Sequence, residues 1–223
     1  MDDGAWVGAQ PAFDKPRREP MFRAPWPALA MAGLLPALYA LQTWLPDGRS
    51  ATAAFGFSPA DLAQGRPAGL VTALFVHGGW THVTLNALAA LAFGAPVARR
   101  LGAGAGGIVA FFAFYLLCGV VANLGFAVMD RGSDAVLVGA SGAVSGLMGA
   151  ASRLMERGSR PAAFTSPSVV GLAAAWLAVN GLIAGFGLDI GAGGAPVAWQ
   201  AHLVGYAAGL LLIGPVLRLV RRG

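Results

Sequence analysis

The stretch Val138-Gly139-Ala140-Ser141-Gly142-Ala143 opens an apolar run in which small residues predominate. Gly142 and Gly146 stand four residues apart in this run, and Gly205 and Gly209 repeat that spacing near the end of the chain. Small residues at this spacing let two helix backbones approach closely in a membrane. The pattern therefore predicts two helices that pack with their backbones in contact.

The composition around this stretch indicates a membrane protein. Of the 223 residues, 57% are hydrophobic and 11% are charged, and the mean hydropathy is +0.65. A soluble domain carries about 25% charged residues, so this chain has too few polar residues to cover a globule. The single cysteine, Cys118, lies in an apolar run, which excludes a disulfide framework and a thiolate metal cluster.

Six apolar segments are candidates for membrane spans, because about 20 helical residues cross a hydrocarbon core of about 30 Å. We expect an all-α polytopic membrane protein, a six-transmembrane-helix bundle over residues 25–218. The expected tails are residues 1–24 and 219–223. The predicted spans are 26–45, 81–97, 107–129, 136–149, 169–187 and 198–216.

The basic residues predict the orientation of these spans. With the N-terminus in the cytoplasm, 12 of the 15 lysines and arginines fall on the cytoplasmic side. This distribution follows the positive-inside rule and predicts that both termini are cytoplasmic. It also accounts for the sequence pI of about 10.3 without nucleic-acid binding. The excess of Arg over Lys and of Ala and Gly is typical of a high-GC bacterium, so we expect the cell (inner) membrane of a bacterium.

A set of polar residues lies within or beside the apolar spans. At a rise of about 1.5 Å per residue, four of them lie about 18 to 25 Å from the cytoplasmic arginines. They therefore share one layer in the outer half of the membrane. Polar residues inside a membrane are rare and usually functional. The four are His82, Asn86, Ser141 and His202, and His77, the third histidine of the chain, lies close by.

The residue types in this layer restrict the chemistry. All ten carboxylates lie outside the apolar spans, which argues against an aspartyl protease and a Ser-His-Asp triad. The chain also has no His-Glu-x-x-His motif. What remains is a serine and histidine dyad, in which a neutral histidine takes the proton of the serine. The Ser141 backbone N–H, the Asn86 amide and a His82 ring N–H are candidate donors to an oxyanion.

These residues resemble the signature of the rhomboid intramembrane serine proteases. The resemblance covers residues 70–211, and the first 24 residues lie outside it. Three motifs on the second, fourth and sixth predicted spans carry it. They are His77-xxxx-His82-xxx-Asn86, Gly139-x-Ser141-Gly142 and Ala201-His202-xx-Gly205-xxx-Gly209.

The resemblance implies a role for each motif residue. Ser141 would be the nucleophile, His202 the general base, and His82 and Asn86 with the Ser141 amide the oxyanion site. His77 would hold water or shape the cavity near its mouth. Gly139, Gly142, Gly205 and Gly209 would support the site. The family cleaves transmembrane proteins near the outer ends of their helices, so the expected partners are such substrates and lipid, with no cofactor, metal or nucleic acid.

Two positions differ from the pattern of many bacterial members. Ser145 stands where an aromatic residue usually packs on the base histidine, so another group must orient His202. The first loop lacks a Trp-Arg pair, and Arg66-Pro67 is the nearest equivalent.

Water must reach a site at this depth, since hydrolysis consumes it. We expect an aqueous cavity walled by spans two, four, five and six, with the glycine-rich loop at 186–195 as a mobile cap. Two other functions remain open. One is a catalytically idle rhomboid-like binder of membrane client proteins, and the other is an ion or metal carrier that uses the three histidines.

Overall fold

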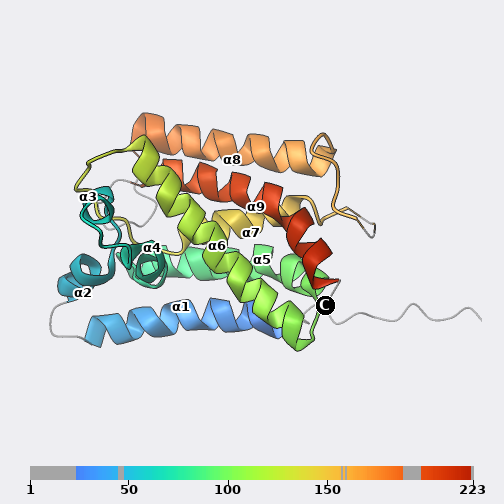
Figure 1. Ribbon diagram of the computed structural model, residues 1–223, viewed down its shortest axis with the longest axis horizontal. Coiled ribbons are helices and arrows are strands. Elements are labelled where there is room, and N and C mark those ends of the chain that lie inside the picture. Colours follow the sequence, from blue (N-terminus) through green and yellow to red (C-terminus); the bar gives the residue numbers. More distant parts are fainter. Residues whose placement is uncertain (1–23, 45–47, 157, 159, 188–196, 222–223) are drawn as a thin grey trace, which may run out of the picture.

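The computed structural model describes residues 24–44, 48–156, 158, 160–187 and 197–221. These residues form helices joined by short connections, and the one β-type pairing among them is an isolated bridge between Phe57 and Leu137. The mostly helical fold agrees with the predicted all-α class (Figure 1). The helices are α1 (Trp26–Trp44), α2 (Gly48–Phe55), α3 (Pro59–Ala63), α4 (Gly69–Thr72), the 3-10 helix η1 (Ala73–Phe75), α5 (Trp80–Leu101), α6 (Ala105–Met129), α7 (Ser141–Ser152), α8 (Pro167–Phe186) and α9 (Trp199–Val220).

Among the described residues, four helices are long and apolar enough to cross a membrane: α5, α6, α8 and α9. They correspond to the second, third, fifth and sixth predicted spans, and they make the chain a multi-pass membrane protein. The first predicted span is the 19-residue α1, which contains Pro36. The fourth is α7, which has only 12 residues. The predicted N-terminal tail up to residue 23, the last two residues of the C-terminal tail and most of the loop at 186–195 lie outside the described residues.

The start of the fourth predicted span is wrong. Residues 136–140 are not helical, and α7 begins only at Ser141. Leu137 exchanges two backbone hydrogen bonds with Phe57, at 2.7 and 2.9 Å, and the Gly139 N–H donates to the Ala73 carbonyl at 2.8 Å. Phe57 and Ala73 thus bind backbone groups of Leu137 and Gly139 that would be paired within α7 if that helix began earlier. Val136 is 50% exposed and only Ala140 of this segment is fully buried, so its apolar character does not require a helix.

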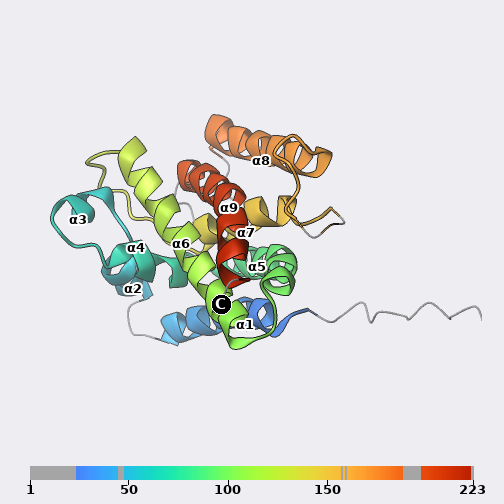
Figure 2. The ribbon, with the colours of Figure 1, turned by 45° about the vertical axis from the view of Figure 1, so that its right-hand side comes forward.

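Helix α7 lies in the interior of the bundle. All of its residues from Gly142 to Ser152 are buried, and it packs against α9, α6 and α5 (Figures 1 and 2). A helix enclosed by protein on all sides does not need the length of a full membrane span, which explains how 12 residues suffice. In contrast, α8 runs along the edge of the bundle beside α9 (Figures 1 and 2).

Glycines allow the close packing of α7 and α9 that the sequence predicts. A Cβ placed on Gly205 would collide with the carbonyl oxygen of Gly142, and one on Gly209 would collide with that of Gly146. The two backbones are therefore in direct contact over two turns. A Cβ on Gly142 itself would lie 2.7 Å from the Cβ of Ala122 on α6, so α7 has no room for larger residues on that side either.

The basic ends of three helices lie at one end of the bundle. Arg99 and Arg100 are in the last turn of α5, Arg218 is in the last turn of α9, and Arg153 follows α7. The Arg153 side chain donates to the carbonyl of Leu210, at 3.2 Å, and packs over the ring of Phe164, 4.2 Å from its centroid.

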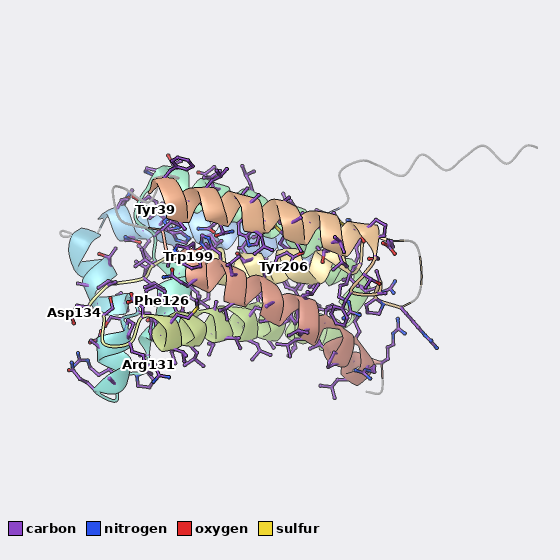
Figure 3. All side chains as sticks on the ribbon, turned by 90° about the horizontal axis from the view of Figure 1, so that it is seen from above. Tyr39, Phe126, Arg131, Asp134, Trp199 and Tyr206 are labelled. Atoms are coloured by element: carbon purple, nitrogen blue, oxygen red, sulfur yellow. The ribbon has the colours of Figure 1, made fainter. Side chains whose placement is uncertain are left out.

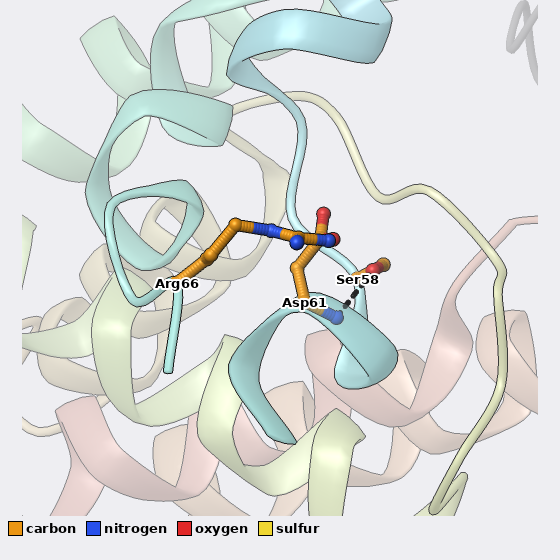
Figure 4. A network of polar contacts seen from close by, with 3 residues as sticks. All are labelled: Ser58, Asp61 and Arg66. Carbon is orange, nitrogen blue, oxygen red and sulfur yellow. Dashed lines mark hydrogen bonds and ion pairs between the residues drawn. The ribbon is translucent and has the colours of Figure 1, made fainter. Parts of the chain in front are cut away.

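The opposite end of the bundle carries Arg131 and Asp134 (Figure 3). The small helix α3 also belongs to this end, since it follows Phe57, which pairs with Leu137. Ser58 caps α3 by accepting a hydrogen bond from the Asp61 N–H at 3.0 Å (Figure 4). Arg66, the sequence's nearest equivalent of the missing Trp-Arg pair, forms an ion pair with Asp61. Its hydrogen bond lowers the pKa of the Asp61 carboxyl.

Candidate active site

The segment before α7 sets the position of Ser141. Gly139 has a φ of +111°, in a region that residues with a side chain rarely adopt. A Cβ on Gly139 would also lie only 2.6 Å from Nε2 of His82. Both the backbone conformation and the space therefore require glycine here. The sharp change of direction at Gly139 leaves Ser141 as the first residue of α7.

Ser141 and His202 are in hydrogen-bond contact. Oγ of Ser141 lies 2.9 Å from Nε2 of His202. His202 is in the first turn of α9 and is 8% exposed. The two helix backbones touch at Gly142, which directly follows Ser141, and at Gly205, which lies one turn after His202. The glycine contact thus brings the two predicted residues together.

The second ring nitrogen of His202 has a partner on α8. Nδ1 of His202 lies 3.0 Å from Oδ1 of Asn180, and the indole ring of Trp176 lies 5.7 Å from the imidazole, centroid to centroid, at 36°. The sequence patterns did not predict a role for either residue. Asn180 could have been found by the criterion that selected Ser141, because it is a polar residue inside an apolar span.

Ser145 does not take over the role of the usual aromatic residue. Its hydroxyl donates to the carbonyl of Ser141 at 2.7 Å, a bond to the preceding turn that is common for serine in apolar helices. The side chains that orient the His202 ring, Asn180 and Trp176, come from α8 instead.

His82 and Asn86 lie on one face of α5 and point toward the segment before Ser141. A Cβ on Gly139 would be 2.6 Å from Nε2 of His82 and 3.6 Å from Nδ2 of Asn86. Asn86 is buried, and its Nδ2 has no hydrogen-bond partner among the described residues. A buried amide donor without a partner is uncommon in proteins, so this group is available to a ligand oxygen.

His77 is completely buried and does not line the cavity described below. Its backbone N–H donates to Oε1 of Gln42 at 3.1 Å, and its carbonyl accepts from Nε2 of Gln42 at 2.9 Å. Its ring accepts a long hydrogen bond, 3.4 Å, from the N–H of Ala140 and lies edge to face with His82. His77 therefore does not itself line the cavity but supports the backbone just before Ser141 and packs against His82, which lines it.

A cavity of about 970 Å³ contains the polar groups. Ser141, His202, His82 and Asn86 all line it. The predicted walls, α5, α7, α8 and α9, all contribute, and α6 adds Asn123 and Phe126. Figure 3 shows Phe126 and Trp199, another wall residue, on neighbouring helices near the end that carries Asp134.

Apolar side chains line the cavity between α5 and α8. Leu85, Ala89 and Phe93 contribute from α5, and Val179 and Ile183 contribute from α8. The cavity is therefore lined by Ser141, His202, His82 and Asn86 on one part and by apolar side chains of α5 and α8 on another.

A family model for the Rhomboid domain matches residues 64–219, which is more than half of the chain. The chain belongs to the rhomboid family. The matched part of this rhomboid contains all of the predicted site residues, from His77 to Gly209. A search of curated proteins found no match. Rhomboids are typically serine proteases, but the family includes inactive members, so membership alone does not assign an activity.

Proposed function

We propose that this rhomboid is an intramembrane serine endopeptidase with Ser141 as nucleophile and His202 as general base. The observation that supports this most is the distance of 2.9 Å between Oγ of Ser141 and Nε2 of His202. Serine is a weak nucleophile until a base takes its proton. A candidate base must first be within hydrogen-bond reach of that proton, and His202 meets this condition.

Acylation of Ser141 would follow from this geometry. Oγ of Ser141 bonds to the substrate carbonyl carbon, its proton moves to Nε2 of His202, and the carbonyl electron pair moves to the oxygen. When the oxyanion collapses, the C–N bond breaks and Nε2 gives the proton to the leaving amine. The acyl group remains on Oγ.

Deacylation would use the same groups. A water molecule gives a proton to Nε2 of His202 and attacks the acyl carbon. The Oγ–C bond then breaks, and the proton returns from Nε2 to Oγ. The sum of the two halves is the hydrolysis of one peptide bond by one water molecule.

Three donors could stabilise the oxyanion. The first N–H groups of a helix have no partner within the helix, and the positive end of the helix dipole favours a negative charge there. Ser141 is the first residue of α7, so its N–H is such a donor. Nδ2 of Asn86 is a second donor, and the His82 ring, which faces the same segment, is the third. Donors that are fixed before the reaction stabilise the developing charge most effectively.

The fold suggests how a substrate would be bound. We include α1 and α7 in a six-helix membrane domain, residues 25–218, with both termini in the cytoplasm of a bacterium. A transmembrane substrate would reach the site from the lipid through the apolar wall between α5 and α8, near its own outer end. Leu85 and Val179, which are 44% and 40% exposed, line this wall from the two helices.

A serine-directed fluorophosphonate tests the proposed nucleophile and base. In the purified full-length protein we expect Ser141 to become covalently labelled. His202→Ala should slow the labelling by a factor of about 10²–10⁴, the usual contribution of a general base. Ser152→Ala, which removes a buried hydroxyl at the other end of α7, should label at the normal rate. A folded wild-type protein that is not labelled would favour the idle binder of membrane clients.

A further inference from the structure

Asn180 is an unusual residue for its helix. Helix α8 lies at the edge of the bundle (Figure 1), and its buried residues are Val169, Asn180 and Ile183. Asn180 is 1% exposed, although an amide in an apolar environment is unfavourable unless it is hydrogen-bonded. A buried polar side chain on an otherwise outward-facing helix therefore requires an explanation.

Both ends of the Asn180 amide have partners, and these fix the direction of the amide. Nδ2 donates to the carbonyl of Trp176 at 2.9 Å. The reversed amide would place Oδ1 against that carbonyl, with no proton between the two oxygens. Oδ1 consequently faces Nδ1 of His202, at 3.0 Å.

This arrangement determines which nitrogen of His202 carries the proton. An amide oxygen can only accept a hydrogen bond, and a neutral imidazole has one donor and one acceptor nitrogen. Nδ1 must therefore be the protonated nitrogen, which leaves Nε2 as the acceptor. Nε2 is the atom that lies 2.9 Å from Oγ of Ser141, so the tautomer that Asn180 selects is the one that a general base needs.

Trp176 restricts the same ring sterically. Its indole is tilted by 36° against the imidazole, with the centroids 5.7 Å apart. Trp176 and Asn180 are four residues apart on α8, so they share one face of that helix. Together they contact one edge and one side of the His202 ring.

We propose that Asn180, assisted by Trp176, is the positioning residue for His202, so that α7, α9 and α8 contribute a Ser141–His202–Asn180 chain of hydrogen bonds. This inference rests on the proposed function and extends it. It also connects the site to the helix that borders the apolar wall. When α8 is displaced from α9, Oδ1 of Asn180 leaves Nδ1 and the base loses its fixed tautomer.

Nitrogen-15 spectra of histidine-labelled protein test the tautomer without reference to activity. The His202 resonances are assigned by their loss in His202→Ala. In the wild-type protein at neutral pH we expect Nδ1 of His202 to resonate as a protonated nitrogen and Nε2 as an unprotonated one. In Asn180→Ala we expect a mixture of the two tautomers. A wild-type spectrum with the proton on Nε2 would overturn the proposal, even if the alanine variant failed to fold.

Kinetics with a transmembrane substrate test the consequence for the reaction. Asn180→Ala should lower kcat about 10- to 100-fold, less than the loss of a general base, and should change KM by less than about twofold. Asn180→Asp, which keeps an accepting oxygen at the same place, should recover at least about tenfold of the loss. Ser152→Ala is the matched control, because it removes another buried polar side chain that donates to a backbone carbonyl, that of Gly149, and that does not line the cavity. It should keep kcat within about twofold.

The outcomes separate this inference from the proposed function. Unchanged kcat in folded Asn180→Ala, or equal losses in the alanine and aspartate variants, would overturn the positioning role and leave the protease intact. A wild-type protein that cleaves no peptide bond but shows the proton on Nδ1, and loses that preference in Asn180→Ala, would support the positioning and overturn the protease.

Discussion

Asn86 is the residue whose environment is most informative about the transition state. Its Nδ2 is buried and has no partner among the described residues, although buried polar groups are hydrogen-bonded in the great majority of cases. The unused donor lies beside the segment that ends in Ser141. A donor whose hydrogen bond forms only when the oxyanion develops in the transition state contributes to turnover more than to substrate binding.

Asn86→Ala should lower turnover by a factor of about 10–1000, the effect of removing one oxyanion donor. KM should change less, because the lost interaction forms only in the transition state. Initial rates over a range of substrate concentrations, with the unfolding temperature as a control for folding, measure both quantities. Unchanged turnover together with weaker binding would assign Asn86 a structural role.

At the level of residues, the sequence predicted the contact between Ser141 and His202 but not the neighbour that orients the histidine. The glycine spacing and the shared membrane depth both bring the pair together, and both can be read along the chain. Asn180 is also polar and lies in an apolar span, but its distance from the nearest cytoplasmic arginines does not reveal which face of α8 points inward. That depends on the packing of α8 against α9.

The helix pair α7 and α9 depends on backbone contact. Gly209→Ala places a Cβ against the carbonyl of Gly146 and forces the helices apart. Overpacking of this kind destabilises by about 1–3 kcal/mol, so we expect a lower unfolding temperature and slower fluorophosphonate labelling of Ser141.

Gly214→Ala is the control on the same helix, because the nearest atom that its Cβ would meet is 3.7 Å away, at the end of the Arg153 side chain. This variant should match the wild-type protein in both measurements. Equal stability of Gly209→Ala and Gly214→Ala would show that the contact between the two backbones is not needed.

Helix α8 is the element that must move if a substrate enters between α5 and α8. A disulfide engineered between the outer ends of these two helices should stop the cleavage of transmembrane substrates, and reduction should restore it. The native Cys118 is buried, so it does not compete with the engineered pair. Full activity of the oxidised protein, with the cross-link verified, would exclude this route.

The boundaries of the elements show where sequence patterns are insufficient. Residues 136–140 are as apolar as a membrane helix, yet their backbone groups bond to Phe57 and Ala73. Hydropathy does not report backbone conformation. Only Gly139, with its positive φ, gave a local signal that the helix starts later.

Over the whole molecule, the charge distribution predicts the orientation. The basic ends of α5 and α9 lie at one end of the bundle, and Asp134 is exposed at the other (Figure 3). In intact cells, Asp134→Cys should react with a membrane-impermeant maleimide. Gly158→Cys, on the loop after α7, should react only after the membrane is permeabilised. The reverse pattern would invert the topology.

The measurement that tests the central claim most directly is cleavage of a panel of model transmembrane proteins by the purified full-length protein, with the products identified by mass spectrometry. The wild-type protein should cut at least one of them at a defined peptide bond near the outer end of its helix. Ser141→Ala, which removes only a hydroxyl, should keep the wild-type unfolding temperature and cut none. Cleavage by folded Ser141→Ala at the wild-type rate would contradict the proposed mechanism.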